Sequence, residues 1–287
     1  MTTSNQTEVL NQHFLVDSEI PRQMVLHADV DSYETALEIG PGKGSITREI
    51  ALFAGRVVAI EKDARMRQYL EDVQREHPNV SVIYGDAITA RFPKHDKMVG
   101  NIPFNITEPL MMKLFNGKPA PSFLLVGENF ANSACRRKDT RLGLLTNAYF
   151  SPEHLMDVGS ESFDPEPSTN AVLVGLYPRE KMSMKKDFPL FTLRCVWDQN
   201  KRPLQDAFRA ALSQYTEEQD AGIDRYVQET RAENPYMDKR VDALTSYEFT
   251  RFFEYLSSAK PKRIWGGSHK PRGGGRSWQS RYGDAMF

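Results

Sequence analysis

The segment that decides the fold is Thr35-Ala-Leu-Glu-Ile-Gly-Pro-Gly-Lys-Gly44, in which a short apolar run breaks into three glycines at alternate positions. This pattern is typical of a buried strand that turns sharply into a helix and leaves room for a ligand against its backbone. A second segment, Gly100-Asn-Ile-Pro-Phe104, places an amide side chain, a proline and an aromatic ring at the end of another apolar run. Together, in this order, the two segments indicate an enzyme that binds a nucleoside-bearing cofactor and acts on a planar amine.

Predicted strands and helices alternate through the first 180 residues. Short β-branched runs predict strands at 35–39, 56–61, 80–86, 97–101, 122–128, near 155–159 and at 171–177, and helices are predicted between them at 45–53, 64–77, 107–115 and 129–138. This alternation predicts an α/β, Rossmann-like, doubly wound parallel sheet. From residue 187 the pattern is helical only, at 188–197, 203–213, 221–231 and 246–258. We therefore expect a flexible N-terminus at 1–10, a catalytic domain at 11–180, a helical domain at 187–258 and a tail at 260–287.

The composition is that of an ordinary globular protein, with 287 residues, 40% hydrophobic and 26% charged. No stretch approaches the roughly 18–20 consecutive apolar residues that a membrane span needs, and the polar first ten residues lack a basic-then-apolar signal region. The two cysteines, Cys135 and Cys195, are too few for a disulfide framework or a metal cluster. We therefore expect reduced cysteines, no metal site and a cytoplasmic location.

The charge of the chain is unevenly distributed. Residues 260–287 contain seven Lys or Arg and one acidic residue, whereas the rest of the chain carries 30 basic and 37 acidic residues. The same segment holds six of the 18 glycines and shows no apolar periodicity, so we expect a disordered basic tail. Arginines and aromatic residues separated by glycine are typical of segments that bind nucleic acid through phosphate contacts and stacking. A solubilising terminus without a partner is the alternative.

Four positions fall at the ends of predicted strands, where an open parallel sheet binds its ligands: Gly40, Glu61, Asp86 and Asn101. Glu61 can accept hydrogen bonds from ribose hydroxyls, and Asp86 from an exocyclic adenine amine. A glycine turn with a ribose-binding acid does not by itself separate a nicotinamide cofactor from S-adenosylmethionine. The Gly-x-Gly-x-Gly spacing and the additional acid at the third strand favour the methyl donor.

The Asn101–Phe104 segment suits the methylation of an aromatic amine, whose lone pair is delocalised into its ring. The Asn101 side-chain oxygen and the carbonyl of Ile102 or Pro103 can accept both amine hydrogens, and the proline keeps these acceptors in place. Phe104 can stack on the base, which has to leave its helix or loop to reach the site. The alternative interpretation is a strand-ending turn with a core phenylalanine.

Six segments, in this order, resemble the motifs of the rRNA adenine N6-dimethyltransferases, which comprise the small-subunit rRNA dimethyltransferases and the macrolide-resistance methyltransferases of large-subunit rRNA. They are Asn11-Gln-His-Phe-Leu-Val-Asp17, Glu38-Ile-Gly-Pro-Gly-Lys-Gly44, Val58-Val-Ala-Ile-Glu61, Tyr84-Gly-Asp-Ala87, Val99-Gly-Asn-Ile-Pro-Phe104 and Ser162-Phe-Asp-Pro-Glu-Pro167. The resemblance extends over residues 11–258. It implies a class I methyltransferase sheet, S-adenosylmethionine as cofactor, ribosomal RNA or a ribosomal subunit precursor as partner, and a monomer.

The resemblance also implies roles for single residues. His13 and Leu15 would close over the methionine part of the cofactor, and Phe104 and Phe163 would sandwich the target adenine. The expected cofactor-binding residues are His13, Leu15, Gly40, Gly42, Glu61, Lys62, Asp86, Ala87 and Asn101, and the expected catalytic residues are Asn101, Pro103 and Phe104.

Two departures from the family pattern bear on these expectations. The family usually has asparagine where this chain has His13, and an imidazole there could respond to pH. After the fifth strand the family typically shows Gln-Lys-Glu, whereas this chain has Gly127-Glu-Asn-Phe-Ala-Asn132. The basic run that follows is either an RNA contact or a solvated helix end. The expected RNA-binding residues are Arg136, Arg137, Lys138, Lys201, Arg202, Arg263, Arg272 and Arg276.

The branch of the family is less sharply indicated. Residues 197–208 and 239–249 resemble segments of small-subunit enzymes, whereas Asn-Ile-Pro-Phe and a Gly/Arg-rich tail are commoner in the macrolide-resistance branch. We favour N6-dimethylation of adjacent adenines near the 3′ end of small-subunit rRNA, with N6-methylation of a large-subunit adenine as the alternative. Two further alternatives are a methyltransferase of another planar amine, in DNA or a small molecule, and a non-catalytic ribosome-assembly or transcription factor on the same fold. The intact glycine turn and Asn101–Phe104 argue against the last.

Overall fold

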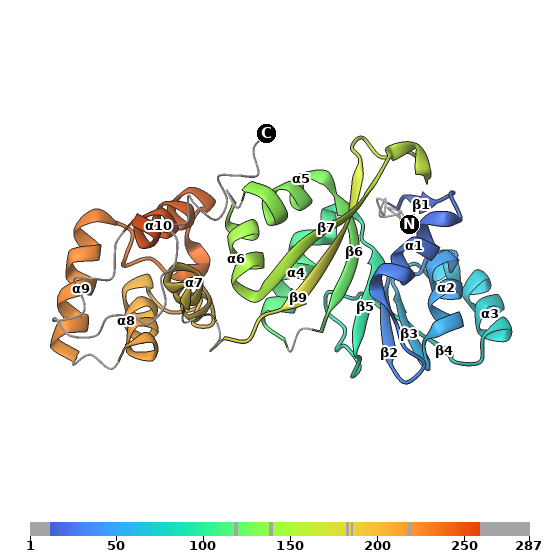
Figure 1. The fold of residues 1–287 in the computed structure, drawn as a ribbon, viewed down its shortest axis with the longest axis horizontal. Coiled ribbons are helices and arrows are strands. Elements are labelled where there is room, and N and C mark those ends of the chain that lie inside the picture. Colours follow the sequence, from blue (N-terminus) through green and yellow to red (C-terminus); the bar gives the residue numbers. More distant parts are fainter. Residues whose placement is uncertain are drawn as a thin grey trace, which may run out of the picture.

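The computed structural model describes residues 12–117, 120–137, 140–181, 184, 186–216 and 220–258. The predictions for residues 1–10 and for the basic tail at 260–287 lie outside this part. Within it, seven strands form one sheet in the order β4-β3-β2-β5-β6-β9-β7 (Figure 1). These strands are β2 (Thr35–Ile39), β3 (Arg56–Glu61), β4 (Val80–Tyr84), β5 (Lys97–Asn101), β6 (Ser122–Gly127), β7 (Phe150–Val158) and β9 (Ala171–Pro178).

Helices cover both faces of the sheet because its strands carry apolar side chains on both. On β6, Leu124 and Val126 belong to one buried cluster, whereas Phe123 and Leu125 belong to the other. The second cluster contains residues of α1 (Glu19–Ala28), α2 (Ser45–Phe53) and α3 (Arg67–Glu76), and the first contains residues of α4 (Thr107–Phe115) and α6 (Arg141–Tyr149). The predicted α/β, doubly wound architecture is therefore confirmed.

One strand corrects the prediction of an entirely parallel sheet. β9 runs antiparallel to both β6 and β7. The connection from β7 to β9, residues 159–170, contains only a 3₁₀ turn (Ser160–Ser162) and the two-residue strand β8 (Phe163–Asp164). Without a crossover helix the chain cannot return to start a parallel neighbour, so the two strands pair antiparallel. β8 pairs instead with β1 (Phe14–Leu15).

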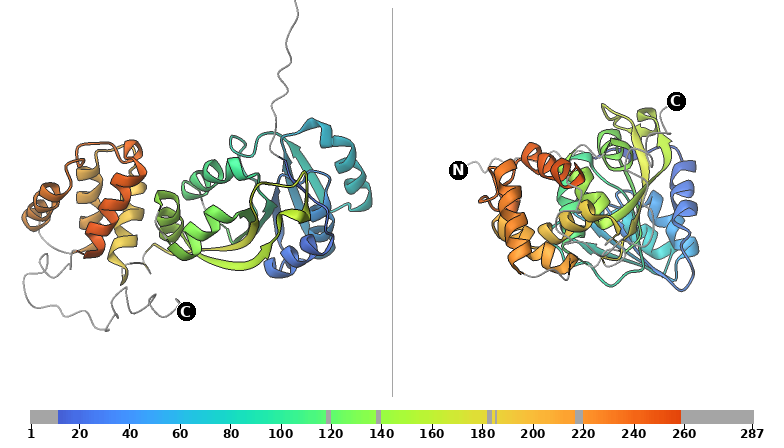
Figure 2. Two further views of the ribbon diagram at one scale, coloured as in Figure 1. Left: turned by 90° about the horizontal axis from the view of Figure 1, so that it is seen from above. Right: turned by 60° about the vertical axis from the view of Figure 1, so that its left-hand side comes forward.

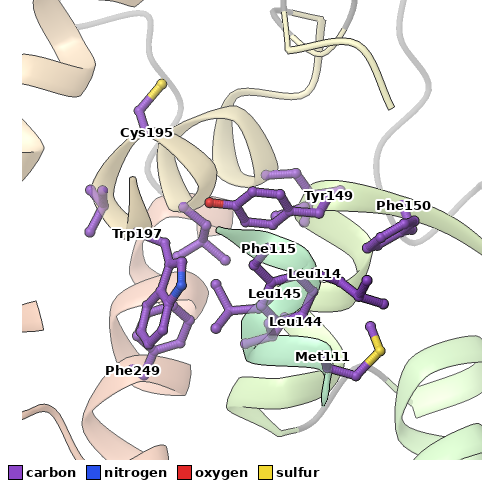
Figure 3. Close-up of a cluster of buried hydrophobic side chains, with 14 of the residues drawn as sticks. Met111, Leu114, Phe115, Leu144, Leu145, Tyr149, Phe150, Cys195, Trp197 and Phe249 are labelled. Atoms are coloured by element: carbon purple, nitrogen blue, oxygen red, sulfur yellow. The ribbon is translucent and has the colours of Figure 1, made fainter. Parts of the chain in front are cut away.

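The described residues between 188 and 258 form helices and their connections without a strand, as the sequence predicts, and gather at one end of the molecule (Figure 2). The helices are α7 (Phe188–Trp197), α8 (Leu204–Tyr215), α9 (Asp220–Glu233) and α10 (Ser246–Ser258). One buried cluster continues from α4 and α6 into this part, where Trp197 and Phe249 lie close to Leu144 and Leu145 (Figure 3). Because the two parts share this core, the predicted domain boundary at 180–187 stays a prediction.

Some local expectations were incomplete. The helices α1 and α6 were not predicted, and the helix predicted at 129–138 is a short α5 (Glu128–Ala131) followed by a π-helical stretch over residues 132–137. Neither Cys135 nor Cys195 forms a disulfide within the described residues. No helix in the described ranges is both long and apolar enough to cross a membrane.

Candidate active site

The turn after β2 forms one wall of the candidate site. Gly40, Gly42 and Gly44 have positive φ angles of 69°, 55° and 83°, a conformation that glycine adopts without steric cost. A Cβ atom on Gly42 would also lie 3.0 Å from the Phe14 ring. The alternate glycines therefore make the sharp strand-to-helix turn that their spacing predicts. The missing side chain at Gly42 also lets Phe14 of β1 lie close to the backbone of this turn.

A cavity of about 370 Å³ lies beside this turn, where β2, β3 and β5 end. All residues predicted from the sequence to bind the cofactor or to act in catalysis line it, namely His13, Leu15, Gly40, Gly42, Glu61, Lys62, Asp86, Ala87, Asn101, Pro103 and Phe104. The fold thus brings these residues together in one place. Their individual roles remain predictions.

Glu61 ends β3 and is almost completely buried, with 3% of its surface exposed. Its carboxylate accepts two backbone hydrogen bonds, from the Gly42 N–H at 2.9 Å and from the Asp63 N–H at 2.6 Å. Burial raises the pKa of Glu61, and these two donors partly oppose the rise. Because a carboxylate can accept about four hydrogen bonds, Glu61 can support the glycine turn and still accept from the hydroxyls of a ligand.

Asp86 opens the loop after β4. The sequence predicted that β4 extends to Asp86, but the strand ends at Tyr84, because the Asp86 side chain forms a turn of its own. Its Oδ1 accepts the Ile88 N–H at 2.8 Å, and the Lys62 Nζ lies 3.5 Å from its Oδ2. The carboxylate is therefore oriented by a backbone and a side-chain contact at the cavity wall.

Lys113, a residue that sequence reasoning missed, holds the same loop from α4. Its ammonium donates to the carbonyls of Ala87, Ile88 and Ala90 and lies over the Phe92 ring, 3.9 Å from the centroid. Three carbonyls match the three donors of an ammonium group. Burial lowers the pKa of Lys113. The only sign of this role in the sequence of α4 is that a single lysine interrupts an otherwise apolar run.

Asn101 ends β5, and its amide has a defined orientation. The Nδ2 group donates to the His13 carbonyl at 2.9 Å, and because a carbonyl only accepts, Oδ1 is left as the free acceptor of the amide. The Pro103 carbonyl accepts the Ile106 N–H at 2.9 Å, at the start of the 3₁₀ turn Phe104–Ile106. Of the two carbonyls that the sequence offered as a second acceptor, Ile102 is therefore the better candidate.

His13 approaches this region from the N-terminal side. Its Nδ1 lies 2.6 Å from the Pro165 carbonyl, and because a carbonyl only accepts, Nδ1 is the donor of this contact. The His13 and Phe104 ring centroids are 6.1 Å apart. Phe163, by contrast, is 4% exposed, pairs with Leu15 across β1 and β8, and is not part of the cavity wall. The structure thus brings only one of the two predicted stacking rings to the cavity.

Of the predicted RNA-binding residues, the three whose side chains the structure describes do not line the cavity. Arg136 is exposed. Lys201 forms an ion pair with Asp242 at 2.7 Å, and Arg202 donates to Gln199 at 2.7 Å. The Arg137 side chain and Lys138, Arg263, Arg272 and Arg276 lie outside the described residues. The structure therefore brings together only Lys201 and Arg202, on the loop before α8.

Sequence reasoning also missed Glu38, an acidic residue inside the apolar run of β2. Its side chain is fully buried, and neither carboxylate oxygen has a hydrogen-bond partner within the described residues. Burial raises the pKa of Glu38 to about 8. The Thr47 hydroxyl lies near enough to favour the charged form slightly, without hydrogen-bond geometry. At neutral pH the group is therefore largely a neutral acid behind the glycine turn.

A doubly wound sheet in which only β9 runs antiparallel, with a glycine turn at the end of β2, is the fold of the class I methyltransferases. A family model described as "Ribosomal RNA adenine dimethylase" matches residues 3–234. The chain belongs to this family of S-adenosylmethionine-dependent enzymes, which confirms the resemblance found in the sequence.

Named relatives and solved structures agree with this assignment. The chain is 28% identical over 271 residues to the ribosomal RNA small subunit methyltransferase A of Chlorobium phaeobacteroides, over 88% of this chain and 94% of the relative. It is also 28% identical to the protein of the same name from Oceanobacillus iheyensis, over 86% and 90%. A dimethyladenosine transferase from Plasmodium falciparum shares the fold, with a TM-score of 0.59, 24% identity and coverage of 85% of this chain and 97% of that chain. The 23S rRNA methyltransferase ErmE has a TM-score of 0.56, with 22% identity and coverage of 85% and 100%.

Proposed function

We propose that the chain transfers methyl groups from S-adenosylmethionine to the N6 amine of adenine in ribosomal RNA and dimethylates adjacent adenines near the 3′ end of small-subunit rRNA. The orientation of the Asn101 amide carries this proposal. Its contact with the His13 carbonyl leaves Oδ1 as an acceptor in the cavity that also contains Glu61 and the glycine turn.

The cavity residues fit the methyl donor. Glu61 would bind the ribose hydroxyls, since its carboxylate keeps accepting capacity beyond its two backbone contacts. Asp86 would accept from the adenine amine, and the glycine turn with His13 and Leu15 would enclose the methionine part. When bound, the donor supplies an electrophilic methyl group.

The Asn101–Phe104 segment would prepare the target amine. The Asn101 Oδ1 and the Ile102 carbonyl would accept its two hydrogens, which favours a pyramidal nitrogen with an available lone pair. Phe104 would stack on the extruded base. No strong base is required, because the nitrogen becomes acidic once it has been alkylated. Phe163 would have to leave the core to act as the second stacking ring, since it is 4% exposed.

The choice of substrate rests on the relatives. Proteins named as small-subunit rRNA methyltransferases align with 86–88% of this chain, including segments of the helical part that resemble small-subunit enzymes. A large-subunit adenine is the second candidate, on the strength of Asn-Ile-Pro-Phe and the Gly/Arg-rich tail. We further infer a monomer that acts in the cytoplasm on ribosomal RNA or a subunit precursor. The complete cavity argues against a non-catalytic factor.

Methyl transfer to ribosomal subunits tests this function. The chain and radiolabelled S-adenosylmethionine would be incubated with small and large subunits that lack these modifications, and the modified nucleotides would be mapped. We expect two dimethylated, adjacent adenines in small-subunit rRNA. Asn101→Ala should abolish transfer but leave donor affinity within a few-fold of wild type. If only large-subunit rRNA became labelled, the substrate would be a large-subunit adenine and not a small-subunit one. A protein that binds the donor but labels neither subunit would contradict the proposed function.

A further inference from the structure

A second recess, of about 250 Å³, shares the Phe104 ring with the cofactor cavity. Its remaining wall comes from the beginning of α4, the end of β6 with α5, the beginning of α6, and Thr169 in the connection between β8 and β9. Neither Asn101 nor Ile102 lines it. The acceptors proposed for the target amine therefore lie in the cofactor cavity, and the recess is a separate place next to it.

The walls of the recess suit a flat, partly apolar ligand. Phe104, Phe130 and Leu142 provide apolar surface. A Cβ atom on Gly127 would lie 3.2 Å from the Phe104 Cγ, so the absence of a side chain at this position keeps both the ring position and the recess. Gly127 begins the segment that departs from the family's Gln-Lys-Glu.

One buried polar group of the recess has no partner in the protein. Thr107 is 5% exposed, lines the recess, and its hydroxyl makes no hydrogen bond among the described residues. A buried hydroxyl left in this state is costly, and a ligand with a polar edge would satisfy it. Asn129, at the exposed rim, offers a second donor and acceptor. Aromatic walls with polar groups at one edge are what an unpaired nucleobase requires.

The rim of the recess also connects to the helical part. Glu108 would repel a phosphate, but the Arg141 guanidinium lies 3.3 Å from its carboxylate and offsets part of this repulsion. Arg141 also donates to the Leu244 carbonyl at 3.1 Å, just before α10. Arg141 thus connects the acid at the rim of the recess to the loop that precedes α10.

We propose that this recess binds the base of the nucleotide next to the target adenine. One aromatic ring lines both sites, so a base in the recess belongs to a neighbour of the target along the strand. Proteins read single-stranded RNA in this way, by stacking splayed bases on aromatic side chains and bonding to their edges. The inference rests on the proposed function and adds a specificity site to it.

The test combines protein and RNA changes. The substrate is an RNA hairpin with two adjacent adenines in its loop, and in matched hairpins one of the two positions is abasic. Leu142→Trp fills the recess, and Thr107→Val removes the hydroxyl. Thr192→Val is the matched control, because Thr192 is also a buried threonine without a hydroxyl partner among the described residues but lies in α7, outside the recess. Donor affinity near wild type in all three variants verifies that they fold.

We expect the wild-type protein to lose about 5- to 150-fold in RNA affinity on one of the two abasic hairpins, the range for one stacked base. Leu142→Trp should show a similar loss on intact RNA and no further loss on the abasic hairpin. Thr107→Val should lose about three- to ten-fold on intact RNA, and Thr192→Val none. The proposal would be overturned if the loss caused by Leu142→Trp added to the loss caused by the abasic position. It would also be overturned if the wild-type protein bound both abasic hairpins as tightly as intact RNA.

A direct readout separates this inference from the proposed function. The neighbouring adenine is replaced by 2-aminopurine, whose fluorescence reports stacking. Binding should change the fluorescence with the wild type and Thr192→Val, and much less with Leu142→Trp. This result without methylation of any RNA would contradict the proposed function and leave the recess as a base site. Methylation of RNA together with the same fluorescence change for all proteins would support the proposed function and contradict the base site in the recess.

Discussion

Removal of the Glu61 carboxylate should weaken both the fold and cofactor binding. In Glu61→Ala the Gly42 and Asp63 N–H groups lose their acceptor. A buried donor left without a partner costs about 1–3 kcal/mol, so the two together cost about 2–6 kcal/mol. The unfavourable burial of the carboxylate, which raises its pKa, offsets part of this. We therefore expect a net loss of about 2–4 kcal/mol in the free energy of unfolding.

The same substitution should weaken S-adenosylmethionine binding by at least about 1.5–3 kcal/mol, the range for a hydrogen bond to a charged group. Asp86→Ala is the matched comparison. Its side chain is 36% exposed and accepts one backbone hydrogen bond within its loop, so we expect a similar loss of affinity but a stability loss of about 1 kcal/mol or less. Only Glu61 should therefore affect both quantities strongly.

Urea unfolding without ligand measures stability, and calorimetric titration with S-adenosylmethionine measures affinity. Unchanged unfolding in Glu61→Ala would show that the glycine turn does not depend on this carboxylate. Wild-type affinity in a folded Glu61→Ala protein would remove the residue from the cofactor site, and the same result for Asp86→Ala would remove Asp86.

Three further predictions concern other parts of the chain. The folded-state pKa of Glu38 is raised to about 8 from 4.5, so its contribution to stability should decline as pH rises between these values, by at most about 1.4 kcal/mol per pH unit. The free energy of unfolding, measured at pH 5 and pH 8, should therefore decline less in Glu38→Gln than in the wild type, and an equal decline would refute this prediction. Lys113→Met should weaken donor binding by about 1–1.5 kcal/mol, because the loop after β4 loses its lysine contacts. Lys97→Met should leave donor binding unchanged, because Lys97 also contacts a carbonyl but lies at the end of β5 that is remote from the cavity. Equal affinities of the two variants would show that the loop holds without Lys113. Deletion of residues 260–287 should preserve donor affinity but reduce RNA affinity and flatten its salt dependence by about 0.7–0.9 in slope per lost phosphate contact, and superimposable curves would mark a passive terminus.

Much of the fold could be predicted because its signals are local. β-branched runs gave β2, β3 and β5 with their observed ends, and α2 and α4 are helices over the predicted residues. The helix α6 could not be found in this way. Every residue from Gly143 to Tyr149 is buried, so the helix has no polar face and its sequence shows no helical period.

The residues of the candidate site also fall into a predictable and an unpredictable group. The glycine turn and the acids at the strand ends were predictable, since parallel strands bring their carboxyl ends to one edge. The sequence could not predict that Lys113 holds the loop after β4, because a lysine on a helix is ordinarily an exposed residue. It also could not predict that Phe163 is buried beside β1.

The sequence by itself determined the alternation of strands and helices and the glycine turn, because each depends on neighbours within a few positions. The meeting of the strand-end residues in one cavity followed from the rule that parallel strands bring their carboxyl ends to one edge. Only the tertiary structure decided the direction of β9, the pairing of β1 with β8 and the orientation of the Asn101 amide. These features depend on contacts between distant segments: His13 and Pro165 are 152 positions apart, and Asn101 and His13 are 88 apart. Local propensity carries no information about such partners, since they become neighbours only when the sheet and its helices pack together.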